Sequence, residues 1–300
     1  MKRLLFLLPL LLTAALHAAP PAKPPIPAVP PVLEGVAGIR GNSALGELGV
    51  ALRGGEPLTE EQWAALESVP LRAYAFSGKV LDNAGLARLA KIGAEKLVIE
   101  GGMANDEGAA NFTAMKSLKL LVFSHSKFGA KTAEALAKHP ALETFRSDGR
   151  CGAVGMEHIA TAPKLRTVRL MHSAANDQSA KALANHPTLE VLGLNSSNSF
   201  DLSDAALQAI GTMRALKELS MSDTVLTYDG GLKRLKDLPN LTKVGFSKVG
   251  STEADLAKLK ADLPKINIVV TEPMTPEERA KWEKSHAYHQ AKALQKPKAH

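Results

Sequence analysis

Cysteine and aromatic residues are scarce in this chain of 300 residues. Cys151 is the only cysteine, which excludes an internal disulfide framework and a cysteine-based zinc cluster. Aromatic residues make up 4% of the chain, whereas 45% of the residues are hydrophobic, a fraction that suits a globular protein and excludes wholesale disorder. The sequence also lacks a phosphate-binding loop, a dinucleotide-binding glycine fingerprint and a serine nucleophile elbow.

A strong charge of one sign is also missing. The 37 lysines and arginines exceed the 30 acidic residues by seven. The basic residues are scattered along the chain and do not form the patch that binding to nucleic acid requires. The composition therefore argues against a nucleic-acid partner.

The N-terminus has the pattern of a signal peptide over residues 1–18. Lys2 and Arg3 precede an apolar run from Leu4 to Leu16, and Ala18 occupies the expected cleavage position. The run is short for a transmembrane helix, which needs about 20 residues, so an uncleaved anchor is the weaker alternative. We therefore expect a protein that is secreted, or located in the periplasm or cell envelope, with no membrane span after cleavage.

Residues 19–40 are expected to form a proline-rich linker. Seven prolines occur between positions 20 and 31. Proline lacks the backbone donor that helices and sheets need, and it favours the extended polyproline conformation. The segment is interpreted as a spacer.

The strongest feature of the sequence is an internal repeat. An apolar residue, two variable residues, a second apolar residue, one variable residue and a third apolar residue recur along the chain. A weaker instance, Leu45/Leu48/Val50, precedes the series, and successive first positions are 23 to 27 residues apart. These first positions are Leu71, Ala94, Leu118, Leu142, Leu165, Leu189, Leu216, Leu241 and Ile266.

Each apolar segment is followed by a turn and a helical stretch. Apolar residues three or four positions apart in these stretches are typical of one face of a helix. A strand, a turn and a helix therefore fit within one unit. The residues expected to cap four of the helices are Asp82, Asp204, Asp229 and Thr252.

Proline recurs just before the next strand, for example at Pro140, Pro163 and Pro187, where it ends the helix. The combination of spacing, cap and proline resembles the leucine-rich repeat family, and most closely its secreted bacterial members. The similarity covers about residues 45–270 and is clearest from Leu202 to Met221. The resemblance implies a curved solenoid with parallel strands on the concave side and helices on the convex side. The family often has Asn three residues after the last strand leucine; the residues found there instead include Ser126, Ser173, Ser197 and Thr224.

One unit is too short to bury both its strand and its helix, but stacked neighbours can share one core. We therefore predict an α/β solenoid over residues 41–271, which follows the linker. Residues 272–300 are expected to be a basic tail. Thr275-Pro276-Glu277-Glu278 has the pattern of a helix start, so a weakly docked helix is expected there.

The outward-facing positions of the predicted strands indicate a candidate ligand-binding surface. Arg146 and Arg169 occupy equivalent positions in neighbouring units, where they could meet an anionic ligand. Asp148 belongs to the same candidate ligand-facing centre. Alternatively, Asp148 neutralises one of the arginines and the group only solvates the surface. The other candidates near these residues are His125, Met171, His172 and Asn195.

No metal site or cofactor is expected. His125 and His172 belong to non-adjacent units, and no third ligand accompanies them. His139 and His186 recur at helix ends before a proline, where a cationic or hydrogen-bonding side chain suits the free carbonyl groups of the helix.

These features predict an exported, non-enzymatic scaffold whose concave face binds a protein or an anionic polymer. Two alternatives stay open. One is a thiol-dependent enzyme or redox sensor that uses Cys151, since the adjacent Arg150 would favour the thiolate. The other is a structural protein of the cell envelope, attached through the linker and the tail.

Overall fold

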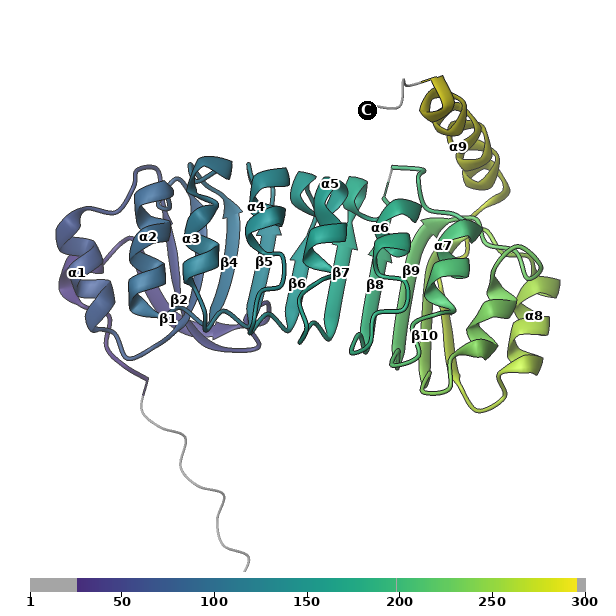
Figure 1. Cartoon of the computed structure of the whole chain (residues 1–300), viewed down its shortest axis with the longest axis horizontal. Helices are drawn as coiled ribbons and strands as arrows, with labels where there is room; N and C mark the ends of the chain where they lie inside the picture. Colours follow the sequence, from purple (N-terminus) through teal and green to yellow (C-terminus); the bar gives the residue numbers. More distant parts are fainter. Residues whose placement is uncertain (1–25, 198, 296–300) are drawn as a thin grey trace, which may run out of the picture.

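The computed structural model describes residues 26–197 and 199–295. The predicted signal peptide lies outside the described residues, as do residues 19–25 of the expected linker and 296–300 of the tail. One 11-stranded sheet, with its strands in sequence order, runs along the molecule (Figure 1). None of the helices in the described ranges is long and apolar enough to cross a membrane.

The first two strands form an antiparallel hairpin, and every later strand pairs in parallel with its predecessor. The predicted parallel solenoid is thus confirmed from the second strand onward. The strands are β1 (Ala37–Asn42), β2 (Glu47–Gly54), β3 (Ala73–Gly78), β4 (Lys96–Gly101), β5 (Leu120–Ser124), β6 (Thr144–Ser147), β7 (Thr167–Met171), β8 (Val191–Asn195), β9 (Glu218–Thr224), β10 (Lys243–Val249) and β11 (Asn267–Thr271).

The helices of the repeats line one face of this sheet (Figure 1). Short 3₁₀ segments complete or replace the helix in several units. The α-helices are α1 (Glu60–Ser68), α2 (Asn83–Ile92), α3 (Ala110–Ala114), α4 (Ala130–Ala135), α5 (Arg150–Ile159), α6 (Asp177–Ala182), α7 (Asp204–Ile210), α8 (Glu253–Asp262) and α9 (Pro276–Gln295), and the 3₁₀ segments are η1 (Pro31–Leu33), η2 (Asp106–Gly108), η3 (His172–Ala174) and η4 (Leu232–Asp237).

The core is continuous because equivalent apolar residues of neighbouring strands lie opposite one another. Phe123 of β5, for example, faces Ile99 of β4, and Leu121 faces Phe145 of β6. All four side chains are buried. Each unit thus buries its apolar face against its neighbours, which stabilises the stack without any disulfide.

The expected linker extends too far into the chain. Residues 31–40, which it included, belong to the fold: Leu33 of η1 is fully buried, and β1 begins at Ala37. Leu33 lies in the same buried cluster as Trp63 and Leu66 of α1. An end cap of this kind is needed because the first repeat has no preceding neighbour to cover its core.

The weaker repeat instance at Leu45/Leu48/Val50 is out of register. Val50 lies opposite Tyr74 of β3, so Val50 occupies the second apolar position of its unit and not the third. Leu45 lies instead in the hairpin turn, buried against Ala73 and Leu120. The hairpin therefore covers part of the concave face, a contact between distant residues that the repeat pattern does not encode.

Two of the four expected helix caps are confirmed. The Asp82 side chain accepts a hydrogen bond from Gly85 N (2.8 Å), and Thr252 forms a capping box at α8. Asp229 caps no helix, because η4 starts after Gly231 without a side-chain cap. Ser203, and not Asp204, caps α7.

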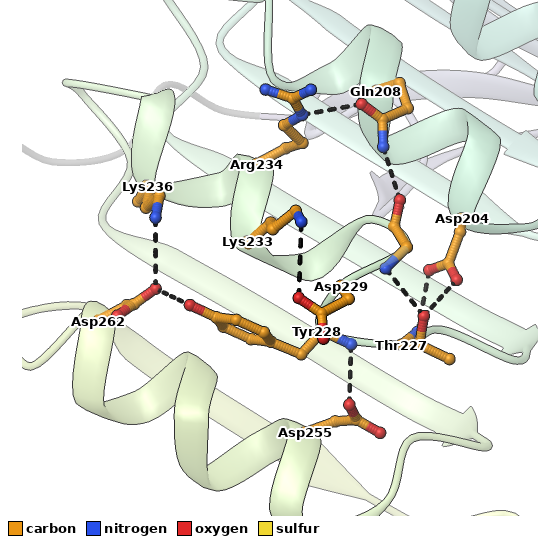
Figure 2. A network of polar contacts seen from close by, with 11 residues as sticks. Asp204, Gln208, Thr227, Tyr228, Asp229, Lys233, Arg234, Lys236, Asp255 and Asp262 are labelled. Atoms are coloured by element: carbon orange, nitrogen blue, oxygen red, sulfur yellow. Dashed lines mark hydrogen bonds and ion pairs between the residues drawn. The ribbon is translucent and has the colours of Figure 1, made fainter.

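Asp204 instead links two repeats. Its carboxylate accepts hydrogen bonds from Thr227 N (2.9 Å) and Thr227 Oγ1 (2.7 Å) in the next unit, as Figure 2 shows. Asp106 makes equivalent contacts, accepting from Gly129 N (2.7 Å) and Thr132 Oγ1 (2.7 Å). Asp177 accepts in the same way from Ser203. Aspartates at the helix starts thus hold the turns of successive repeats together.

The two helix-end histidines act as neutral hydrogen-bonding groups. His139 is buried, and its Nε2 donates to the Met115 carbonyl (3.1 Å) of the preceding repeat, while its Nδ1 accepts from Ala141 N (3.4 Å). His186 Nδ1 accepts from Thr188 N in the same way (3.4 Å). Burial lowers the pKa of both rings. The predicted hydrogen-bonding role is confirmed, and the cationic form is wrong.

The C-terminal tail is helical, and it docks more firmly than its thin apolar stripe suggests. The Thr275–Glu278 capping box is present at the start of α9. Trp282 is buried and stacks on His286 (ring centroids 4.5 Å apart). His286 Nδ1 donates to the Phe200 carbonyl (2.6 Å), and His289 lies 3.1 Å from Asp201. One aromatic anchor and two imidazoles fix α9, which a count of apolar residues overlooks.

Asp204 and Asp229 provide a matched pair of variants, since both lie in the network of Figure 2. Asp204→Ala should lower the free energy of unfolding by about 1–2 kcal/mol, because two partly buried donors of Thr227 lose their acceptor. Asp229→Ala should change it by less than about 0.5 kcal/mol, since this side chain is exposed and forms only a surface ion pair with Lys233 (3.5 Å) within the part of the chain that the structure describes. Urea unfolding of both variants checks this, and equal losses would contradict the inter-repeat link.

The lowered pKa of His139 and His186 makes stability depend on pH. As the pH falls, the unfolded chain takes up protons at these histidines near their ordinary pKa of about 6.5, whereas the folded chain takes them up only at lower pH. The free energy of unfolding is therefore highest above about pH 6.5 and decreases below it. The double variant His139→Gln/His186→Gln should lose less stability than the wild type between about pH 7.5 and about pH 5. Urea unfolding at both pH values measures the difference.

Candidate functional site

The centre of the open concave face is a pair of arginines on neighbouring strands. Arg146 of β6 lies directly opposite Arg169 of β7 in the parallel ladder. In the part of the chain that the structure describes, neither guanidinium group makes a salt bridge, and Arg146 Nε is buried without a hydrogen-bond partner. Burial and the nearby charge of Arg169 lower the pKa of Arg146. The pair is a concentration of positive charge that the described residues do not balance.

Asp148 does not neutralise these arginines. Its nearly buried carboxylate accepts hydrogen bonds from Ser124 Oγ (2.9 Å) and from His125 N (3.0 Å), and it lies 3.6 Å from His125 Nδ1. These contacts tie the end of β5 to the end of β6. The alternative in which Asp148 balances one of the arginines is therefore wrong, because the only ion pair of Asp148 among the described residues is with His125.

The two predicted histidines stand at strand ends and in separate units. His125 and His172 both adopt a left-handed backbone conformation, with φ of 49° and 50°. The His125 side chain is largely exposed, whereas His172 Nδ1 lies 3.4 Å from the Ser197 carbonyl. No group of three potential metal ligands occurs within residues 26–197 and 199–295.

An open hollow of about 360 Å³ adjoins Arg169 on the C-terminal side. Its floor consists of Gly193, Ser220 and Gly245, which follow Arg169 in the same row of the sheet. A side chain at Gly245 would meet no atom closer than 3.9 Å, so this part of the floor is free. The repeat alignment of the sequence already contains these small residues. The hollow forms because three of them follow one another on neighbouring strands. Its rim includes Met171, Asn195, Ser222, Ser247, Val269 and Thr271.

Met171 and Asn195 are thus brought together beside the hollow, as predicted. Met171 is 44% exposed and lies opposite Asn195 in the ladder. Asn195 Oδ1 accepts hydrogen bonds from Ser197 N (3.1 Å) and Ser197 Oγ (2.5 Å). The Asn195 amide is therefore held in a fixed orientation at the rim.

The N-terminal half of the concave face is closed. Leu45 of the hairpin turn covers Ala73 and Leu120, and Ala75, Val98 and Val122 pack beside them. Lys96 secures the turn through Glu47 (3.0 Å) and the Leu45 carbonyl (3.3 Å). The accessible part of the face therefore begins at the two arginines and extends toward β11.

Cys151 is not an activated thiol. It is 1% exposed within α5, and burial raises the pKa of its thiol. A reactive cysteine needs the opposite, an accessible group with a lowered pKa. The expectation that Arg150 favours the thiolate is therefore wrong, because burial is the dominant effect.

The ordered strands, the 23-to-27-residue spacing and the outer helices define an α/β solenoid of the leucine-rich repeat type. No family model and no curated protein matches the sequence. Among solved structures, a protein of Bacteroides fragilis is 15% identical over 68% of this chain and 66% of its own length, with a TM-score of 0.43. A leucine-rich repeat protein of Leptospira interrogans is 14% identical over 73% of this chain and 88% of its own, with a TM-score of 0.22.

The unbalanced arginine pair predicts that removing one charge stabilises the fold. Arg146→Met keeps the length of the side chain but removes the repulsion from Arg169 and the unpartnered Nε. We expect the free energy of unfolding to rise by about 0.5–1 kcal/mol. Lys131→Met, on the exposed surface of α4, should change it by less than about 0.5 kcal/mol. Urea unfolding measures both, and a clear loss of stability in Arg146→Met would contradict the proposed repulsion.

Proposed function

We propose that the protein is an exported, non-enzymatic scaffold whose concave face binds an anionic protein or polymer. The observation that carries this proposal is the adjacency of Arg146 and Arg169 without a carboxylate partner among the described residues. Two adjacent like charges lower the free energy of unfolding, and destabilising arrangements of this kind are commonly found where function needs them. A ligand carboxylate would supply the missing charge and accept hydrogen bonds from both guanidinium groups.

The surroundings of the pair favour a macromolecular ligand over a small molecule. The arginines lie on an open face, and the hollow beyond Arg169 is lined by hydroxyl, amide and small apolar groups. A preformed surface of this kind needs little ordering when a partner binds. The anion would contact the arginines while a neighbouring group of the ligand occupies the hollow.

The concave face offers no aromatic platform within the described residues. The large aromatic side chains of the repeats, such as Tyr74, Phe123 and Phe246, are buried in the core. Stacking on aromatic rings is the usual way in which proteins hold single-stranded bases. This composition supports a partner that is recognised through carboxylates and hydrogen bonds, and not a nucleic acid.

Export and the absence of catalysis are parts of the same proposal. The signal-peptide pattern of residues 1–18 supports passage into the envelope or the medium, as in secreted bacterial leucine-rich repeat proteins. The buried Cys151 removes the support for a thiol-dependent enzyme or redox sensor. Attachment to the envelope through the proline-rich segment and the tail is compatible with a binding role.

Binding of poly-L-glutamate tests the proposed anionic site. We expect the double variant Arg146→Met/Arg169→Met to weaken binding about tenfold or more, because each charged hydrogen bond contributes about 1.5–3 kcal/mol. Isothermal titration calorimetry or surface plasmon resonance at fixed ionic strength measures the effect.

The control for this experiment is the double variant Lys131→Met/Lys181→Met. It removes the same charge from exposed positions on α4 and α6, on the opposite face of the sheet. Its affinity should change less than about twofold, since exposed distant charges are screened. If both double variants bind poly-L-glutamate equally weakly, binding depends only on the net charge of the protein, and the proposed site is overturned.

A further inference from the structure

The two ends of the solenoid differ in how their terminal units are capped. At the N-terminal end, Leu33 of η1 is fully buried and the β1–β2 hairpin follows it. At the C-terminal end, β11 pairs only with β10 and has no neighbour on its other side among the described strands. Repeat stacks need a cap at each end because the last unit otherwise exposes its core.

The last repeat leaves most of its apolar residues half-buried, although Leu259 of α8 is buried. In the preceding unit, Leu232, Val244 and Phe246 are at most 1% exposed. The corresponding side chains of the final unit pack against the core from one side only, so the end of the solenoid has an uncovered apolar face. These residues are Leu256, Leu263, Ile266, Ile268 and Val270.

The C-terminal helix does not cover this face. Arg279 Nη1 of α9 donates to the Gly250 carbonyl (2.9 Å), and the next contacts of the helix are with Phe200 and Asp201. These partners lie after β10 and after β8, so α9 leads back over the loops at the strand ends and away from β11 (Figure 1). The outer edge of β11 is left accessible.

The outer edge of β11 can accept another strand. Asn267 N donates to the Thr242 carbonyl (3.0 Å), and successive backbone groups of a strand alternate in direction. Ile268 and Val270 therefore present their N–H and C=O groups to the outside. Within 267–271 there is no proline and no charged residue, the devices that normally protect an edge strand from pairing.

We propose that this edge pairs with the same edge of a second copy of the chain, antiparallel, about a two-fold axis at Val269. This register places Ile268 opposite the partner's Val270, and both of these residues have outward-facing backbone groups that can exchange hydrogen bonds. Polar Asn267 then faces the partner's Thr271. The segment is thus complementary to itself, as a two-fold interface requires.

Charge at the two ends of the strand favours this orientation. Lys265 precedes β11 and Glu272 follows it, and both are exposed. Antiparallel pairing places each lysine near the partner's Glu272, whereas parallel pairing would place like charges together. The dimer also covers the apolar ends of both solenoids. Because Val269 and Thr271 line the hollow, the second copy would complete its open side.

The two-fold axis permits a charge-swap experiment at Val269, which is 40% exposed on the concave face. Wild-type protein should sediment as a dimer in analytical ultracentrifugation. Val269→Lys and Val269→Glu should each be monomeric, because residue 269 lies beside its own copy and like charges repel. An equimolar mixture of the two variants should again form dimers, because the charges are then opposite.

Val154→Lys and Val154→Glu serve as controls, since Val154 is 50% exposed on α5, far along the chain from β11. Both should remain dimeric. A monomeric wild type, dimeric single variants at position 269, or a mixture that stays monomeric would each overturn the proposal. Circular dichroism of each variant identifies any loss of folding. Sedimentation is measured without any anionic ligand and none of these substitutions changes Arg146 or Arg169, so failure of the dimer and failure of the proposed anionic site are distinguished by separate measurements.

Discussion

The structure depends on one constraint: a unit of about two dozen residues cannot bury a strand and a helix by itself. Stacking in parallel register solves this problem, because each apolar side chain then lies against its counterpart in the next unit. Leu121 against Phe145 is one such contact. The same constraint explains the ends of the molecule, where Leu33 and the first hairpin cover one terminal unit and the other remains open.

The register also determines the chemistry of the surface, because it turns residues 23 to 27 positions apart into neighbours. At the helix starts this produces bonds such as Asp204 to Thr227, which join successive turns. On the concave face it places Arg146 beside Arg169, and next to them a row of small residues that leaves the hollow. The same register thus produces the stabilising bond between Asp204 and Thr227 and the repulsion between Arg146 and Arg169. The repulsion is the feature that indicates the candidate ligand-binding site.

The sequence predicts the structural features that recur in every unit, but not those that occur once. Strand positions from β3 onward and the adjacency of the arginines follow from the spacing, whereas the parallel order is implied by the resemblance to leucine-rich repeat proteins. The fold of residues 31–40, the position of Leu45 and the docking of α9 depend on contacts between distant segments, which periodicity does not contain. Asp148 was misplaced for a different reason: backbone amides and hydroxyl groups compete for a carboxylate, and the His125 amide and Ser124 satisfy it before an arginine does.

Arg146 and Arg169 are neighbours whose charges none of the described residues balances. A double-mutant cycle of Arg146→Met and Arg169→Met on the free energy of unfolding tests this most directly. If the two groups repel each other, each single variant relieves the same repulsion, so the double variant gains less than the sum of the singles. We expect a coupling of about 0.5 kcal/mol or more that shrinks with added salt. Additive effects that do not change with salt would contradict it.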